Sequence, residues 1–365
     1  ILDALQVLKL KNTLEKPAVT DPVSLPDDIE TWLKHLSSVD VNERFKAFIT
    51  LSEKGAGVSF ALAKHLKKNL DHDLMINILR LVSRTFPLEA VNDLFDIINR
   101  KEIDNTIKFA VYSALEAFPE LESAASVVRG ISESSLSVRL AAMKVLDKNL
   151  SDFVGAEIKN RIESGTKKGE LLVETILDAG ARHIIEYLMI SDTFSYIASN
   201  YLIRTAPVQV LDTFIEILKK RNLKSTAKKY LNIREERAAR DKNRVIVISS
   251  SESILNTYCK ILYTSGLSCL TFNRPQDAFE AIVSQKPTAI ICDLFLNDMT
   301  GMDLAREVRG IYSKEEVPII ISALQKNLDK TLLQKELNRS DVNTIWGFPP
   351  EQNQIKSWIK SGYAS

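Results

Sequence analysis

A single acidic side chain at the end of an apolar run is the residue of this sequence best placed to do chemistry. The run from Ala289 to Cys292 stops at Asp293, and an amphipathic segment with Leu304 and Val308 four residues apart follows. This order predicts a buried parallel strand, a loop and a helix. Ligands bind at the carboxyl ends of strands in open α/β sheets. We therefore expect Asp293 to belong to a functional site.

Strand and helix patterns alternate regularly around Asp293, from residue 244 to the end of the sequence. Five β-α units with apolar strands predict a doubly wound parallel sheet. With Met299 six and Gly301 eight residues after Asp293, this third of the chain resembles the receiver domain of bacterial response regulators. The resemblance implies a flavodoxin-like fold in which Asp293 accepts a phosphoryl group from a histidine kinase. Strands are expected at 245–248, 268–272, 289–292, 318–322 and 342–346, and helices at 253–263, 275–284, 302–311, 327–338 and 351–359.

The resemblance implies further groups around the acceptor, and two of them differ here. Receivers place an acidic pair directly after the first strand, where this sequence has Ser249 and Ser250. They follow the fifth strand with a Lys-Pro pair, where this sequence has Phe348 and Pro349. The bond before that proline is commonly cis in the family. The proline is therefore retained, whereas the acids and the lysine are not.

The resemblance also assigns positions at the ends of strands four and five. The hydroxyl that ends the fourth strand in the family is assigned to Ser322, although a strict count along the strand reaches Ala323. The aromatic residue of the family's fifth strand falls at Ile345, beside Trp346. Together with Trp358 in the last helix, this region forms either an interface for a partner or part of the core beneath it.

The missing groups decide what Asp293 can do. Phosphorylation of a carboxylate needs Mg²⁺, a hard cation held by carboxylates, carbonyls and waters. Two serines in place of the acidic pair remove most of the charge that holds the ion, and the lost lysine removes a second stabilising charge. We therefore expect a pseudo-receiver without metal or cofactor. The alternative is an active receiver that binds Mg²⁺ through Asp293 with help from Glu252 or Asp298.

Helical patterns separated by short polar breaks occupy residues 26–222. Apolar landmarks recur at steps of 31, 33, 31 and 31 residues and then at a shorter step, which indicates helical hairpins stacked in an array. The segment 137–142 resembles the HEAT-repeat signature, and Asp40, Asp73 and Asp104 occupy comparable helix-cap positions. Such arrays usually bind other macromolecules. The landmarks are Leu51, Val82, Leu115, Leu146, Leu177 and Leu202.

A basic segment joins the two parts. From Lys219 to Arg244 there are 11 Lys or Arg against three acids, without Pro or Gly, which predicts a helical connector at 223–243. Its charge would suit phosphates or a membrane surface, but packing along the acidic remainder of the chain explains it better. We therefore regard nucleic-acid binding through the connector and the repeats as a second alternative function.

The composition is that of a globular chain. It has 365 residues, 45% of them hydrophobic, and a net charge of +1, which favours neither nucleic acid nor membrane as the main partner. No apolar run approaches the length of a membrane span, and no basic-then-apolar leader begins the sequence. The cysteines Cys259, Cys269 and Cys292 all stand in apolar surroundings, which suggests buried thiols in a reducing bacterial cytoplasm.

These observations predict a multidomain chain. An N-terminal extension, 1–25, precedes an all-α HEAT-like solenoid, 26–222; the basic connector, 223–243, then leads to an α/β receiver with a five-stranded parallel sheet, 244–365. We expect a non-enzymatic signal-transduction protein that binds protein partners through the repeats and the receiver surface. The first alternative is a phosphorelay receiver, phosphorylated on Asp293 by a histidine kinase, that controls the repeats as its output.

Overall fold

The structure is a computed structural model, largely helical with one five-stranded parallel sheet. It describes residues 29–38, 40–67, 70–100, 103–118, 121, 124–240, 244–324 and 341–361. The predicted extension 1–25 and the predicted helix 327–338 lie outside these residues. Within them, no helix combines the length and the apolar character that crossing a membrane would require.

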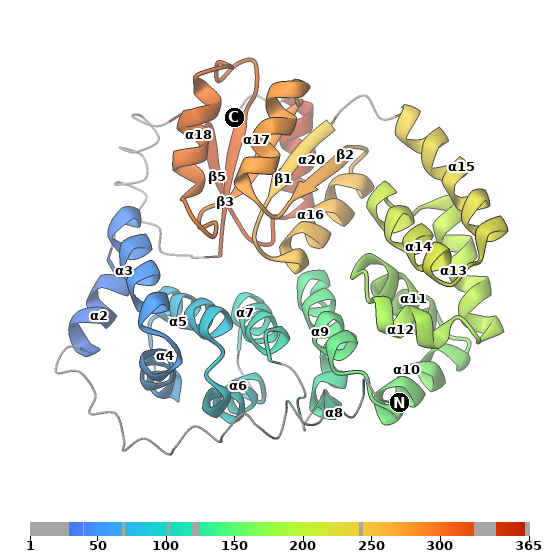
Figure 1. The fold of residues 1–365 in the computed structure, drawn as a ribbon, viewed down its shortest axis with the longest axis horizontal. Helices are drawn as coiled ribbons and strands as arrows, with labels where there is room; N and C mark the ends of the chain where they lie inside the picture. Colours follow the sequence, from blue (N-terminus) through green and yellow to red (C-terminus); the bar gives the residue numbers. More distant parts are fainter. Residues whose placement is uncertain are drawn as a thin grey trace, which may run out of the picture.

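Successive helices form the part of the chain before the sheet, here called the array. In Figure 1 they follow an arc below and beside the α/β part, from α3 to α15. All six landmarks are at most 1% exposed, and they lie on α3, α5, α7, α9, α11 and α13. The bounds are α2 (Ile29–Leu36), α3 (Val41–Lys54), α4 (Ala56–Ala63), α5 (His72–Thr85), α6 (Val91–Ile98), α7 (Asn105–Glu116), α8 (Ala124–Val127), α9 (Leu136–Lys148), α10 (Asp152–Glu163), α11 (Lys167–Asp178), α12 (Arg182–Leu188), α13 (Asp192–Arg204) and α14 (Val208–Lys220).

Carboxylate caps begin several of the landmark helices. Asp40 accepts hydrogen bonds from the first-turn N–H groups of α3, and Asp104 does the same for α7, as predicted. The prediction for Asp73 is wrong, because Asp71 is the cap of α5 and Asp73 already lies in its first turn. The pattern places a cap only to within a residue or two, since two aspartates here flank one histidine.

The basic connector is the helix α15 (Lys224–Arg240), which packs against α14. Ala227 and Tyr230 are buried, and the Tyr230 ring meets the Phe214 ring edge-on at 5.2 Å between centroids. Arg234 Nε pairs with Asp212 Oδ1 at 2.8 Å, and Arg237 donates to the backbone oxygens of 203 and 206. Part of the connector's positive charge is thus used to hold it on the array.

The sheet has the order β2-β1-β3-β4-β5, with every neighbouring pair parallel. Strands β1 to β4 lie within one residue of the prediction, whereas β5 begins two residues later than expected, at Thr344. The strands are β1 (Arg244–Ile248), β2 (Ser268–Phe272), β3 (Ala289–Asp293), β4 (Ile319–Ala323) and β5 (Thr344–Gly347); the described helices of this part, here called the receiver-like domain, are α16 (Glu252–Thr264), α17 (Pro275–Ser284), α18 (Gly301–Arg309) and α20 (Gln352–Lys360).

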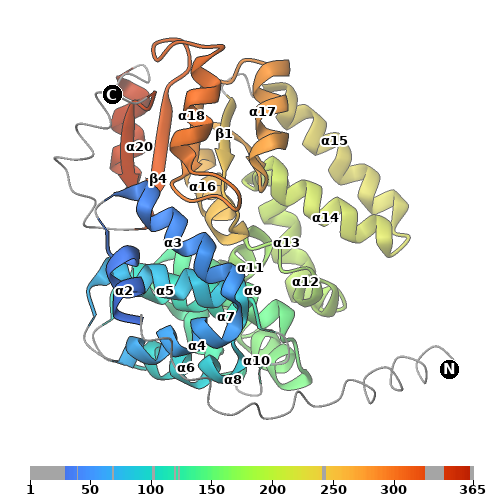
Figure 2. The same cartoon turned by 60° about the vertical axis from the view of Figure 1, so that its left-hand side comes forward.

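The receiver-like domain sits in the arc of the array, with the carboxyl ends of its strands toward α5, α7 and α9 (Figures 1 and 2). One continuous cluster of buried apolar side chains runs from α2 through the array into α16, β5 and α20. Tyr258 of α16 and Phe348 after β5 both belong to it. The two parts therefore share a core and do not merely touch at their surfaces.

Candidate functional site

Asp293 is the last residue of β3 and is 5% exposed. Its Oδ2 accepts a hydrogen bond from Ser249 Oγ at 3.1 Å. Burial raises the pKa of its carboxyl, and the nearby Arg80 guanidinium and the Ser249 hydroxyl counteract that rise. The predicted acceptor thus lies at the carboxyl end of a central strand, but its charge is poorly solvated.

The loop after Asp293 is held close to the strand by Gly301. A Cβ at this position would lie 2.5 Å from the backbone oxygen of Asp293 and 2.9 Å from Ile321 Cδ1, so only glycine fits. Thr300 and Asp303 form a capping box that begins α18. The glycine that the pattern placed eight residues after the acceptor therefore has a packing role in fixing the acceptor loop.

The positions of the family's acidic pair contain hydroxyls that serve other purposes. Ser249 is fully buried and donates to Asp293, whereas Ser250 is exposed. Glu252 forms an ion pair with Lys144 of α9, which lowers the pKa of the glutamate. In the described part of the chain no cluster of three or more His, Cys, Asp or Glu side chains could hold a metal ion. With two hydroxyls in place of the acidic pair and Glu252 paired with a lysine, these residues do not fit a Mg²⁺ site.

Phe348, at the place of the family's lysine, is 4% exposed. Its ring centroid lies 4.9 Å from that of Phe109 on α7 and 5.8 Å from that of Tyr258 on α16. The bond between Phe348 and Pro349 is cis. This side chain therefore supplies apolar contact between array and receiver-like domain where a lysine would supply charge.

The remaining predicted positions lie in the core around these groups. Ser322 is opposite Asp293 in the sheet register, and its Oγ accepts from Tyr258 Oη at 2.8 Å. The Trp346 and Trp358 rings meet edge-on at 5.3 Å between centroids and are 4% and 6% exposed, while Ile345 is half-buried. In this structure the two tryptophans fill the core and leave little surface for a partner.

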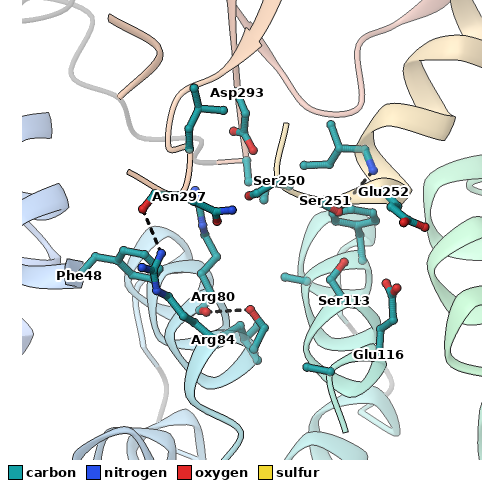
Figure 3. A pocket seen from close by; sticks show the side chains of 18 of the residues that line it. Phe48, Arg80, Arg84, Ser113, Glu116, Ser250, Ser251, Glu252, Asp293 and Asn297 are labelled. Carbon is teal, nitrogen blue, oxygen red and sulfur yellow. Dashed lines mark hydrogen bonds between the residues drawn. The ribbon is translucent and has the colours of Figure 1, made fainter. Parts of the chain in front are cut away.

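Arginines of the array contact the loop after Asp293, and no pattern in the sequence predicts this contact. Arg80 of α5 donates through Nη2 to the Phe295 oxygen at 2.8 Å, and its guanidinium lies 4.9 Å from the Phe295 ring centroid. One turn later, Arg84 Nη1 donates to the Asn297 oxygen at 3.1 Å. Figure 3 shows Arg80 rising from α5 toward Asp293. Burial lowers the pKa of Arg80, and Asp293 counteracts the shift.

A cavity of about 470 Å³ separates the array from the acceptor end of the sheet. Side chains of α5, α7, β3 and the loop after β1 point into it (Figure 3). Its lining combines aromatic side chains, hydroxyls, arginines and carboxylates, among them Phe109, Ser113, Arg80, Glu116 and Asp293. Asn297 and Ser250 reach it from the receiver-like domain, whereas Asp298, weighed as a metal ligand, is exposed and does not line it.

A second polar contact joins α16 to the array farther along the arc. Lys260 Nζ lies 2.9 Å from Asp178 Oδ2 of α11 and 2.7 Å from Tyr201 Oη of α13, and Tyr201 in turn donates to Asp178. Glu174 Oε2 is 3.6 Å from the same nitrogen. Burial raises the pKa of Asp178, and Lys260 counteracts the rise. We call these four residues the Lys260 cluster.

Comparison with known proteins gives similarity to receivers over part of the chain. No protein-family model matches the sequence. The phosphate regulon transcriptional regulatory protein PhoB of Pseudomonas aeruginosa is 25% identical over 100 residues, which are 27% of this chain and 44% of that protein. This chain thus matches less than half the length of its curated relative.

Solved structures similar to part of the chain include several receivers. A CheY-like receiver domain from Methylobacillus flagellatus is 16% identical and covers 33% of this chain and 98% of its own, with a TM-score of 0.29. A receiver domain from Clostridium thermocellum is 19% identical, covers 33% of this chain and 93% of its own, and has the same TM-score. The five-stranded parallel sheet described above is consistent with a receiver-like α/β domain.

Proposed function

We propose that this chain is a non-enzymatic signal-transduction protein in which a pseudo-receiver is docked on a HEAT-like helical scaffold. The observation that carries the proposal is the set of groups at the acceptor end of the sheet. Ser249 donates to Asp293, Arg80 of the array lies near it, and the buried Phe348 occupies the place of the family's lysine. None of these groups supplies the negative charge with which a receiver's acidic pair holds Mg²⁺. The domain then acts through its contacts, as a docking module, in a cytoplasmic pathway.

Docking on the array supports this reading of the acceptor face. In a working receiver the acceptor must be open to a phosphodonor and must exchange its metal with solvent. Here Asp293 is 5% exposed, and α5 and α7 face its end of the sheet across the cavity. A partner protein would meet the outer surfaces, where the array exposes Phe153, Ile190 and Tyr196.

The test is intact-mass spectrometry of the full chain after incubation with Mg²⁺ and a small phosphodonor such as acetyl phosphate. We expect no mass increase of one phosphoryl group in the wild type. Asp293→Asn is the control, because it removes the acceptor carboxylate with little change in shape. An adduct that forms on the wild type and is absent from Asp293→Asn would overturn the proposal.

That outcome would support the second candidate, a phosphorelay receiver controlling the array. The observation in its favour is that the acceptor keeps its place at the end of β3 beside a cavity. Nucleic-acid binding has less support, because Arg234 and Arg237 of the connector are engaged with the array. Binding to unrelated DNA sequences that weakens steeply with salt would revive it.

A further inference from the structure

The cavity at the boundary between the array and the receiver-like domain has the size and lining of a ligand site. Small-molecule sites are clefts of roughly 300–1,000 Å³ with apolar walls and a few convergent polar groups, and this cavity has about 470 Å³. Its apolar wall includes Phe48, Phe86 and Phe109. Because both parts of the chain contribute walls, the site exists only when they are docked.

The guanidinium group of Arg80 has a fixed orientation in the cavity, and one of its hydrogen-bond donors is unpaired among the described residues. The Arg80 guanidinium lies 4.9 Å from the Phe295 ring centroid and 5.7 Å from that of Phe48, which fixes its orientation. Its Nη2 donates to the Phe295 oxygen, but its Nη1 is buried and has no hydrogen-bond partner in the described part of the chain. A buried guanidinium nitrogen without an acceptor costs free energy, so this arrangement suits an oxyanion from outside the chain.

The neighbouring helix presents a second unsatisfied group to the same space. Ser113 Oγ of α7 is buried, lines the cavity and has no hydrogen-bond partner among the described residues. Arg84 adds a second positive charge one turn along α5, and the exposed Ser250 adds a further hydroxyl from the receiver-like domain. Figure 3 shows these side chains entering the cavity from separate elements.

The carboxylates of the cavity are largely compensated. Glu252 is paired with Lys144, and Glu116 Oε1 lies 3.4 Å from Lys148 Nζ. Asp293 accepts from Ser249 and has no ion pair within the described residues. Among the described residues that line the cavity, the two guanidinium groups of Arg80 and Arg84 then stand against one carboxylate without an ion pair, that of Asp293, which leaves positive charge for a ligand.

We propose that this cavity binds a small oxyanion ligand of the phosphate or phosphomonoester class, with Arg80 Nη1 and Ser113 Oγ as its donors. Arg80 and Arg84 neutralise the anion, and the aromatic wall receives the remainder of the ligand. Binding is non-covalent, so no bond to Asp293 forms. The proposal goes beyond the docking function, because it makes the boundary of the two parts sensitive to a metabolite.

The experiment is isothermal titration of the full chain with inorganic phosphate and, separately, with a phosphomonoester such as AMP, at constant ionic strength. We expect saturable 1:1 binding that weakens about tenfold or more in Arg80→Met, since an ionic hydrogen bond contributes about 1.5–3 kcal/mol. Arg80→Lys keeps the charge without the planar fork and should recover only part of the affinity. Arg204→Met is the matched control, because Arg204 is exposed at the end of α13 and does not line the cavity.

The outcomes separate this proposal from the proposed function. Absence of saturable binding to both probes, or equal affinity in Arg80→Met and Arg204→Met, would overturn it. If Arg80→Met does not fold, the same titration is made with Ser113→Ala. An affinity of Ser113→Ala equal to that of the wild type would also count against the site. Binding retained in Asp293→Asn supports the non-covalent site, whereas binding lost there together with a phosphoryl adduct on the wild type would overturn both proposals.

Discussion

The receiver-like domain meets the array in two polar regions that are built in opposite ways. In the Lys260 cluster, the ammonium group contacts Asp178, Tyr201 and Glu174, and the hydrogen-bonding groups satisfy one another. Around Asp293, by contrast, Arg80 and Ser113 each have a buried atom that lines the cavity and has no hydrogen-bond partner among the described residues. Buried polar groups that are fully paired stabilise a structure, whereas a buried group without a partner calls for an explanation such as a water, an ion or a ligand. The first region is therefore a clamp and the second a site.

The largest expected change in the free energy of unfolding comes from the apolar contact of Phe348. Phe348→Ala removes a buried ring that packs on Phe109 of the array and Tyr258 of α16. We expect a loss of about 3–5 kcal/mol in the free energy of unfolding, from lost burial and the cavity left behind. Denaturant unfolding of the full chain measures it, and a loss below about 1 kcal/mol would show that the contact is not part of a shared core.

The clamp is tested by Lys260→Met, which preserves the aliphatic stem and removes the charge. Asp178 then stays buried without its cation, and breaking a buried pair in this way costs about 3 kcal/mol or more. Lys286→Met is the matched control, because the Lys286–Glu316 pair is about half exposed and contributes at most about 1 kcal/mol. Equal losses in the two variants would contradict the description of Lys260 as a clamp.

The site is tested by the pH dependence of Asp293→Asn. Burial raises the folded-state pKa of Asp293 above its value in the unfolded chain, so ionisation is disfavoured in the folded state. Its charge therefore destabilises the fold as pH rises from about 4 through the raised pKa, and not below that range. We expect Asp293→Asn to gain stability relative to wild type across this window and to level off above it. Unfolding midpoints from pH 4 to 8 measure this, and a gain that shrinks with rising pH would reverse the sign.

The smallest effect is expected for Ser113→Ala without ligand. Ser113 Oγ has no hydrogen-bond partner in the part of the chain that the structure describes, so the free energy of unfolding should change by no more than about 0.5 kcal/mol. The contrast with Lys260→Met sharpens the comparison, since both substitutions remove a buried polar group of the same boundary. A destabilisation above about 2 kcal/mol would show that Ser113 is structural.

The strands and turns of this structure could be predicted from the sequence, but the contacts between segments far apart in the chain could not. Apolar runs and their spacing predict β3 ending at Asp293 and a glycine close behind it, because strand burial and turn geometry are local properties. The contact of Arg80 with Phe295 joins residues 215 positions apart, and nothing in either segment specifies the other. Phe348 could be recognised as a missing lysine, but its packing on Phe109 depends on how array and sheet dock.

Because the array and the receiver-like domain share a core, an outside protein must compete with the array for the face that contains Asp293. The array is joined to the receiver-like domain through a helix and a few residues, so it is present at that face as a built-in competitor. Tethered groups act at effective concentrations of roughly millimolar when the link is short. An outside protein that needs this face must bind tightly enough to displace a neighbour that never diffuses away.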